Sequence, residues 1–155
     1  MKTFKLLLGV AAIAAAFAAA SAHAQSFSAT LTGLGPQLLT TGTFNGVDYS
    51  TRNAGILEFD FGDAFCVEAG QGIGFPETLV YDIQDPSSLT SHNTISKLVG
   101  GYLASGQTDL DAAAVQWAIW EVIQDGTGGS LSTGSVRVED ASVSSLANTY
   151  LSQVD

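Results

Sequence analysis

Two residues of this sequence stand out for the chemistry they could do: the single cysteine, Cys66, and the glutamine Gln116. Cys66 lies between Phe65 and Val67 in a stretch that is typical of a β-strand. Strand alternation places Cys66 on the face that also carries Glu68, opposite the two apolar neighbours. A thiol on a polar face in an oxidising compartment is exposed to oxidation or to pairing with another chain. We therefore expect something to cover this thiol or to consume it.

Gln116 lies within a predicted helix that spans Ala112 to Ile123. On a helical wheel it falls in the centre of the apolar stripe, while Glu121 and Asp125 face away. A buried amide without hydrogen bonds costs roughly 1–3 kcal/mol. Backbone groups of a loop usually satisfy such an amide, so the wheel alone leaves a structural role and a reactive role both open.

The first half of the chain reads as antiparallel strands, because short runs rich in Thr, Phe and Val are broken by turn residues. Gly62 and Asp63 form a tight connection that predicts a hairpin between the third and fourth strands. The expected strands are Phe27–Thr32, Gly42–Tyr49, Ile56–Phe61, Ala64–Glu68 and Thr78–Ile83.

The second half of the chain has helical spacing from His92 onward. The helix of Gln116 is capped by Thr108 or Asp109 and ends before Gly126. A strand at Ser135–Glu139 and a helix at Val143–Val154 complete the chain. We predict one α+β domain, an antiparallel β-sandwich or barrel whose sheet is packed by the central helix.

The N-terminus has the pattern of a secretory signal peptide. Lys2 and Lys5 precede an apolar run from Leu6 to Ala20, and Ala22-His23-Ala24 forms a cleavage motif. We expect residues 1–24 to be removed after Ala24 and residues 25–155 to form a single secreted or cell-surface domain. No second apolar run of that length follows, so we expect no membrane span in the mature form.

Charge and histidine content exclude several classes of function. The formal net charge is −10, and loss of the two leader lysines lowers it by two, to −12. Nucleic acid is not an expected partner, because phosphate binding needs clustered cations. After cleavage His92 is the single histidine, so a Cys/His zinc site cannot form. A hydrolase would have to use His92 as its base, and no nucleophile motif lies near it in the sequence. We expect no metal or cofactor and no enzymatic activity.

The stretch Phe65-Cys66-Val67-Glu68, followed by a helix that carries Gln116-Trp117-Ala118-Ile119-Trp120, resembles the paired motifs of bacterial thioester domains. It is also similar to the extracellular part of exported proteins that end in a PEP-CTERM sorting tail. The resemblance implies a Cys66–Gln116 thioester cross-link, with Phe65, Ala118, Ile119 and Trp120 as the matched scaffold.

That cross-link would make the protein an adhesion module. A thiolate attacks the carboxamide carbon and expels ammonia, and the resulting thioester acylates an amine on a partner protein or glycan surface. Two features depart from the family pattern: Val115 stands where a threonine is usual, and acidic residues near Cys66 are expected to raise its pKa. These acidic residues are Glu58, Asp60, Asp63 and Glu68.

Two other functions remain open at this point. A structural or matrix protein of the same fold would keep Cys66 free or use it to join two chains. A carbohydrate-binding module would need exposed tryptophans, but we expect Trp117 and Trp120 to lie in the core.

Overall fold

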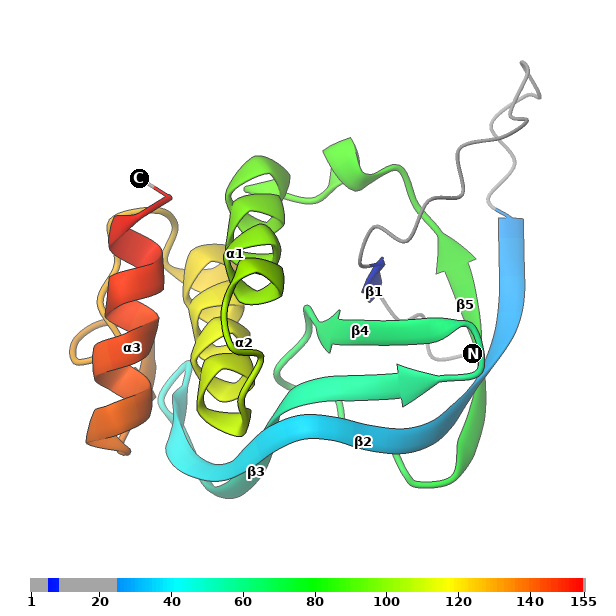
Figure 1. Cartoon of the computed structure of the whole chain (residues 1–155), viewed down its shortest axis with the longest axis horizontal. Coiled ribbons are helices and arrows are strands. Elements are labelled where there is room, and N and C mark those ends of the chain that lie inside the picture. Colours follow the sequence, from blue (N-terminus) through cyan, green and yellow to red (C-terminus); the bar gives the residue numbers. More distant parts are fainter. Residues whose placement is uncertain (1–5, 9–24, 155) are drawn as a thin grey trace.

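The fold comes from a computed structural model that describes residues 6–8 and 25–154 (Figure 1). The expected cleavage after Ala24 lies outside these residues. The described elements follow one another as β1 (Leu6–Leu8), β2 (Gln25–Phe44), β3 (Val47–Phe59), β4 (Gly62–Cys66), β5 (Glu77–Ile83), the short 3₁₀ turn η1 (Pro86–Ser88), α1 (His92–Ala104), α2 (Asp109–Gln124), β6 (Val136–Val138) and α3 (Ala141–Ser152).

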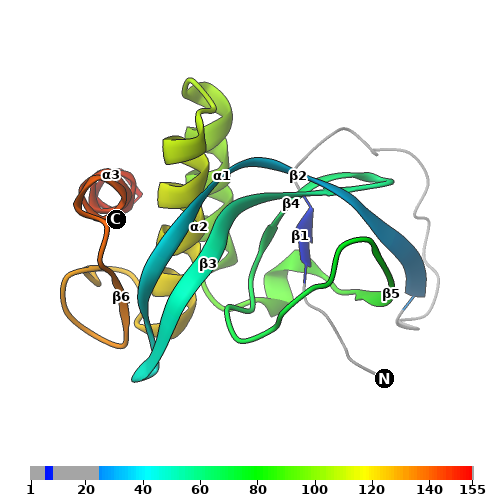
Figure 2. The same ribbon diagram turned by 90° about the horizontal axis from the view of Figure 1, so that it is seen from below.

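The described strands form a six-stranded antiparallel sheet, so the predicted α+β class with an antiparallel sheet is confirmed. The strand order is β1-β4-β3-β2-β5, and β6 pairs with the far end of β2. The long strands β2 and β3 bend sharply along their length (Figure 2). Register shifts accompany the bend, and at one of them Gly55 is required, because a Cβ there would lie 2.3 Å from the carbonyl oxygen of Pro36.

The strand predicted at Gly42–Tyr49 is wrong. The structure places a hairpin turn inside it, at Asn45 and Gly46, whose φ angles of 51° and 74° suit these two residues. The predicted connection at Gly62 is also displaced, because the chain turns at Asp60-Phe61 and Gly62 already begins β4. Asn-Gly between apolar residues is the strongest short hairpin signal, and the sequence prediction overlooked it.

The apolar core has two parts, one on each face of the sheet. Helix α2 packs between the sheet and the other two helices, as both views show (Figures 1 and 2). The smaller part lies under the curled end of β2 and contains Ala29, Leu31, Phe59, Ala64 and Tyr81. Within the described residues, no helix is both long and apolar enough to cross a membrane.

Helix α2 is buried on all sides, from Ala112 to Val122. The expectation that Glu121 faces away from the core is therefore wrong, since this side chain is fully buried. A helical wheel assumes one covered face, whereas α2 is covered by the sheet and by α1 and α3 together.

The ends of α2 agree with the sequence prediction. Thr108 accepts a hydrogen bond from the Asp111 N–H, and the Asp111 carboxylate in turn accepts from the Thr108 N–H. Gly126 follows the last turn with a φ of +85°, which glycine adopts without strain. This capping fixes where along the sheet the middle of the helix lies.

Candidate functional site

Cys66 and Gln116 meet where the end of β4 contacts the middle of α2. The Cys66 N–H donates a hydrogen bond of 3.0 Å to Oε1 of Gln116. Nε2 of Gln116 donates one of 2.7 Å to the Cys66 carbonyl oxygen. The structure therefore brings together the two residues that the sequence singled out, across 50 positions of chain.

The carboxamide of Gln116 takes the place of a peptide group on a neighbouring strand. It pairs with both the N–H and the C=O of Cys66, as one strand residue pairs with another. Gln116 is only 1% exposed, so its predicted burial is confirmed. The partner is the strand backbone rather than a loop. This two-point contact holds the carboxamide beside the one thiol of the chain.

One of these two hydrogen bonds polarises the carboxamide in the direction that acyl transfer requires. The Cys66 N–H points at Oε1, the oxygen that gains negative charge when a nucleophile adds to the carbon. Nε2, the atom that would leave as ammonia, is held at the Cys66 carbonyl. The Sγ atom belongs to the same residue as that N–H, three bonds from its nitrogen, and it donates its own hydrogen bond to the Glu68 carbonyl.

The Cys66 thiol itself is held back from ionising. Burial is the main cause that raises its pKa to about 11, and the negative charge of Glu68 adds to the effect. Two groups lower the thiol pKa and partly offset this rise. The Glu68 carbonyl accepts a 3.3 Å hydrogen bond from Sγ, and Arg52 contributes its positive charge. The expected rise is confirmed in direction, but burial exceeds the acidic side chains as its cause.

The face assigned to Cys66 from the sequence needs correction. The pairing of Leu57 with Ala64 puts Cys66 on the same side of the sheet as Leu57, not on an acidic side with Glu58. The sequence prediction assumed that this sheet has one apolar face, whereas apolar side chains cover both faces. The thiol is half-buried because it borders an apolar cavity.

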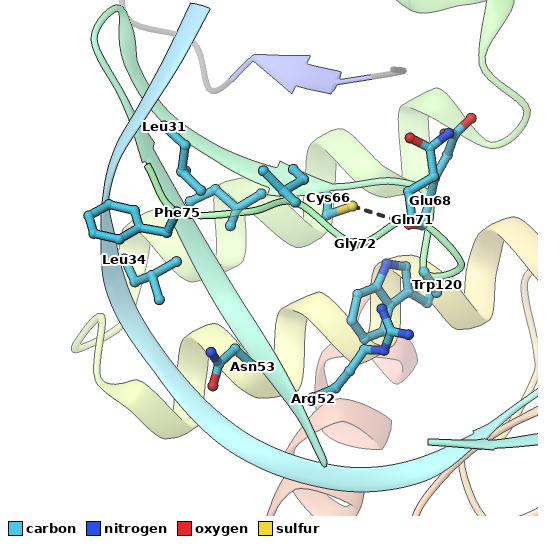
Figure 3. Close-up of a pocket in the computed structure, with 13 residues that line it drawn as sticks. Leu31, Leu34, Arg52, Asn53, Cys66, Glu68, Gln71, Gly72, Phe75 and Trp120 are labelled. Carbon is cyan, nitrogen blue, oxygen red and sulfur yellow. Dashed lines mark hydrogen bonds between the residues drawn. The ribbon is translucent and has the colours of Figure 1, made fainter. Parts of the chain in front are cut away.

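That cavity has a volume of about 320 Å³ and gives access to the thiol (Figure 3). Leu31, Leu34, Leu57 and Phe75 form much of its apolar wall, and Arg52 and Glu68 supply charged groups. The Glu68 carboxylate also accepts a hydrogen bond from Gln71. A small or flexible chain with a polar end therefore fits beside Cys66.

The matched scaffold residues lie in the core around Cys66 and Gln116. Ala118 and Ile119 are fully buried on α2, and Phe65 packs edge-on against Tyr102 of α1. Trp120 lines the cavity and is 4% exposed, and its indole N–H is a buried donor with no partner within the described residues. A ligand in the cavity is the natural acceptor for it.

The other tryptophan is a core residue. Trp117 is 1% exposed, and its Nε1 donates a 3.0 Å hydrogen bond to the Thr40 hydroxyl. It lies edge-on to Trp120 at 5.1 Å between ring centroids. The predicted core position of both rings is confirmed, and neither offers the flat exposed face on which a sugar stacks.

Sequence reasoning missed Arg52 as a member of the site. Arg52 is on β3 and lies over the Tyr49 ring, 4.0 Å from its centroid. Its charge opposes the rise in the thiol pKa. It is one of three basic residues outside the leader, but strand alternation groups it with Ile56 rather than with Leu57, so periodicity gave no signal for it.

Helix α2 carries a second buried polar group, Glu121. Burial raises the pKa of this carboxyl group to about 7, and the charge of Asp125 adds to the rise. The Ser130 N–H acts in the opposite direction, but within the described part neither carboxylate oxygen has a hydrogen bond of normal geometry. Gly129 faces the carboxyl group so closely that a Cβ there would lie 2.1 Å from Oε1.

No cluster of three or more metal-ligating side chains occurs in residues 6–8 and 25–154. Comparison with family models, with curated proteins and with solved structures gave no match for this chain. The contact between Cys66 and Gln116 and the cavity beside it are therefore the features that point to a function.

Proposed function

We propose that this protein is a secreted thioester-domain module whose Cys66 and Gln116 form an internal thioester that acylates an amine on a partner surface. The single observation that carries the proposal is the paired hydrogen bonding between the Gln116 carboxamide and the Cys66 backbone. The proposal includes export after cleavage at Ala24, and a sheet that curls into the barrel-like half of a thioester domain.

The bond-forming step balances without a cofactor. The Cys66 sulfur adds to Cδ of Gln116, the C–N bond breaks, and Nε2 leaves as ammonia with the thiol proton. With a pKa of about 11, only about one thiol in ten thousand is ionised at pH 7. Bond formation is therefore slow, and the fixed geometry compensates for the low thiolate fraction.

The acylation step reverses the roles of the two side chains. An amine enters the cavity and attacks Cδ of Gln116, a C–N bond forms, and the C–S bond breaks. The proton of the amine passes to the sulfur, whose high pKa favours the neutral thiol. The apolar wall suits the methylene chain of a lysine, and Glu68 attracts its ammonium group before reaction.

A structural protein of the same fold is the second candidate. The half-buried state of the thiol argues against its use for joining two chains, because a partner sulfur would have to enter the cavity. Two chains joined through Cys66 would contradict the thioester. A carbohydrate-binding role has less support, because both tryptophans are buried.

Intact mass of the exported protein tests the proposal directly. Thioester formation removes ammonia, so the mass is expected to fall about 17 Da below that of the unmodified chain, and methylamine to add about 31 Da while releasing one thiol. An N-terminal Gln25 also loses ammonia when it cyclises, so Cys66→Ala provides the reference mass. An equal deficit in wild type and Cys66→Ala, with a titratable thiol in wild type, would refute the thioester.

A further inference from the structure

Within the described residues, the outer edge of strand β4 pairs with the three residues of β1 and with no other strand. In the strand order, β4 lies between β3 and β1 (Figure 1). Leu6, Leu7 and Leu8 pair antiparallel with Cys66, Phe65 and Ala64. Because β1 belongs to the proposed leader, export would leave this edge of β4 open next to the reactive cysteine.

The open edge would offer specific backbone groups. Along a strand, the N–H and C=O of one residue point to one side and those of the next residue to the other. Cys66 directs both groups at Gln116, so Phe65 directs its own to the opposite side, where Leu7 lies. The N–H and C=O of Asp63 face the same way by the same alternation. An added strand could therefore form backbone hydrogen bonds with Phe65 and Asp63.

A second cavity lies beside the same strand. It has a volume of about 180 Å³ and is lined by Asp63, Ala64 and Phe65 of β4 and by Val99, Tyr102 and Leu103 of α1. A strand residue opposite Phe65 would have its side chain on the Phe65 face, which is the face that α1 covers. The cavity therefore suits an apolar side chain at that position of an added strand.

We propose that the outer edge of β4 is a strand-addition site for an extended apolar, lysine-bearing segment of the partner protein. The leader segment Leu6–Leu8 occupies this site before cleavage. Main-chain pairing with Phe65 fixes the register, and the cavity between β4 and α1 selects an apolar residue. Asp63, which is exposed at the edge, and the strongly negative chain favour a basic segment.

The pairing register of the added strand with β4 determines which of its lysines is acylated. This step rests on the proposed function. In an antiparallel pair, side chains of directly opposite residues share a face, and diagonal neighbours lie about 7–8 Å apart. A lysine opposite Cys66, or two residues earlier in the added strand, lies on the Cys66 face. A lysine one residue earlier lies on the other face and cannot reach the thioester.

A synthetic peptide tests the docking separately from the chemistry. The probe is a dye-labelled lysine-serine-leucine-leucine-leucine-lysine peptide, in which the three leucines repeat the pairing of β1. Binding is measured by fluorescence anisotropy on the full chain, made without export and carrying Cys66→Ala. Leu7→Pro should release β1 and tighten peptide binding about tenfold or more. Ala14→Pro, a proline in the leader outside β1, should leave it unchanged.

Two N-methylated peptides identify the edge. Methylation of the leucine opposite Phe65 should weaken binding about tenfold, because it removes a ladder donor. Methylation of the leucine opposite Cys66 should change it less than about twofold, because that N–H points away from β4. Equal effects of the two methyl groups, or equal binding by wild type and Leu7→Pro, would overturn the proposal. So would a dimer of Leu7→Pro that binds no peptide, because a second copy would then occupy the edge.

The chain with Cys66 intact tests the register. In the peptide, the first lysine stands two residues before the leucine that pairs with Cys66, and a covalent adduct should form with this lysine. No adduct should form when this lysine is moved one residue later. Docking without any adduct, in a protein that lacks the mass deficit, would refute the thioester but leave the strand-addition site standing. An adduct that forms equally at every lysine position would refute the site but leave the thioester standing.

Discussion

Gln116 and Glu121 lie five positions apart on α2, and both are buried polar side chains, but their surroundings are opposite. Gln116 makes two hydrogen bonds with the backbone of Cys66, so its burial carries no penalty. Glu121 faces Gly129 without a hydrogen bond of normal geometry in the described region, and its pKa rises to about 7.

The difference separates two uses of a buried polar group. A satisfied amide is fixed in one orientation, which suits a group that must react with a particular neighbour. An unsatisfied carboxyl group instead makes folding depend on whether it carries a proton. The residues around Gln116 therefore hold its carboxamide in one position, and those around Glu121 make the stability of the fold depend on pH. Matched substitutions at the two positions test this contrast.

The largest expected effect is that of Gln116→Met in the Cys66→Ala background, where no cross-link can form. The substitution keeps the volume but leaves the N–H and C=O of residue 66 unsatisfied. We expect the free energy of unfolding to fall by about 3–4 kcal/mol in chemical denaturation. The matched control is Glu121→Met, which removes a poorly satisfied acid and should be neutral or stabilising at pH 8. Equal losses in both variants would remove the distinction between the two positions.

The next effect is a dependence of stability on pH through Glu121. In the folded chain its pKa is about 7, above its ordinary value of 4.5, so the folded state binds the proton more tightly. This contribution is complete below about pH 4.5 and is lost as the pH rises through about 7. We expect a loss of about 2–3 kcal/mol between pH 5 and pH 8 relative to Glu121→Gln. Parallel pH profiles for the two proteins would contradict the assignment.

A somewhat smaller effect is expected for Gly129→Ala. The added Cβ would lie 2.1 Å from Oε1 and 2.9 Å from Cδ of Glu121, and the buried side chain has little room to move. We expect a loss of about 1–3 kcal/mol by thermal or chemical unfolding. Gly100→Ala is the control, because nothing lies within 4 Å of its Cβ position and alanine favours the helix α1. A tolerated alanine at position 129 would mean that the Glu121 side chain is free to turn away.

The smallest effect concerns Arg52. Its positive charge lowers the pKa of the Cys66 thiol, so Arg52→Ala should raise that pKa and reduce the thiolate fraction. In the Gln116→Met background, which keeps the thiol free, we expect alkylation by iodoacetamide at pH 8.5 to slow about two- to fourfold. Lys97→Ala is the distant control, because Lys97 contacts the carbonyl of Val154 instead. An unchanged rate would exclude Arg52 from the electrostatics of the site.

Local signals predicted much of the fold. The cap at Thr108, the glycine at Gly126 and the apolar spacing from His92 predicted the helices to within a few residues, because these depend on neighbours in sequence. The turn at Asn45-Gly46 had a clear local signal that the prediction overlooked, and the turn at Asp60-Phe61 was placed two residues too late. The facing side of Cys66 was predicted wrongly because the alternation of Phe65 and Val67 was matched to a single apolar face, whereas both faces of the sheet are covered.

The sequence identified Cys66 and Gln116 as unusual residues, but it did not predict how they contact each other. The burial of Gln116 followed from helix periodicity, whereas its partner came only from the resemblance to thioester domains. The burial of Glu121 had no local signal, because it results from the packing of α1, α3 and the sheet around α2 together. Arg52 and the cavity were missed for the same reason, since they depend on the bend of β2 and β3.

The all-round burial of α2 also determines how the molecule would bear mechanical load. In the proposed covalent complex, a pulling force on the partner would enter the protein through the Gln116 side chain, at the middle of this helix. Because α1, α3, β2, β3 and β6 all contact α2, the tension is shared among them rather than applied to one strand that could peel away. A covalent attachment at this position would therefore resist detachment by shear until the whole domain unfolds.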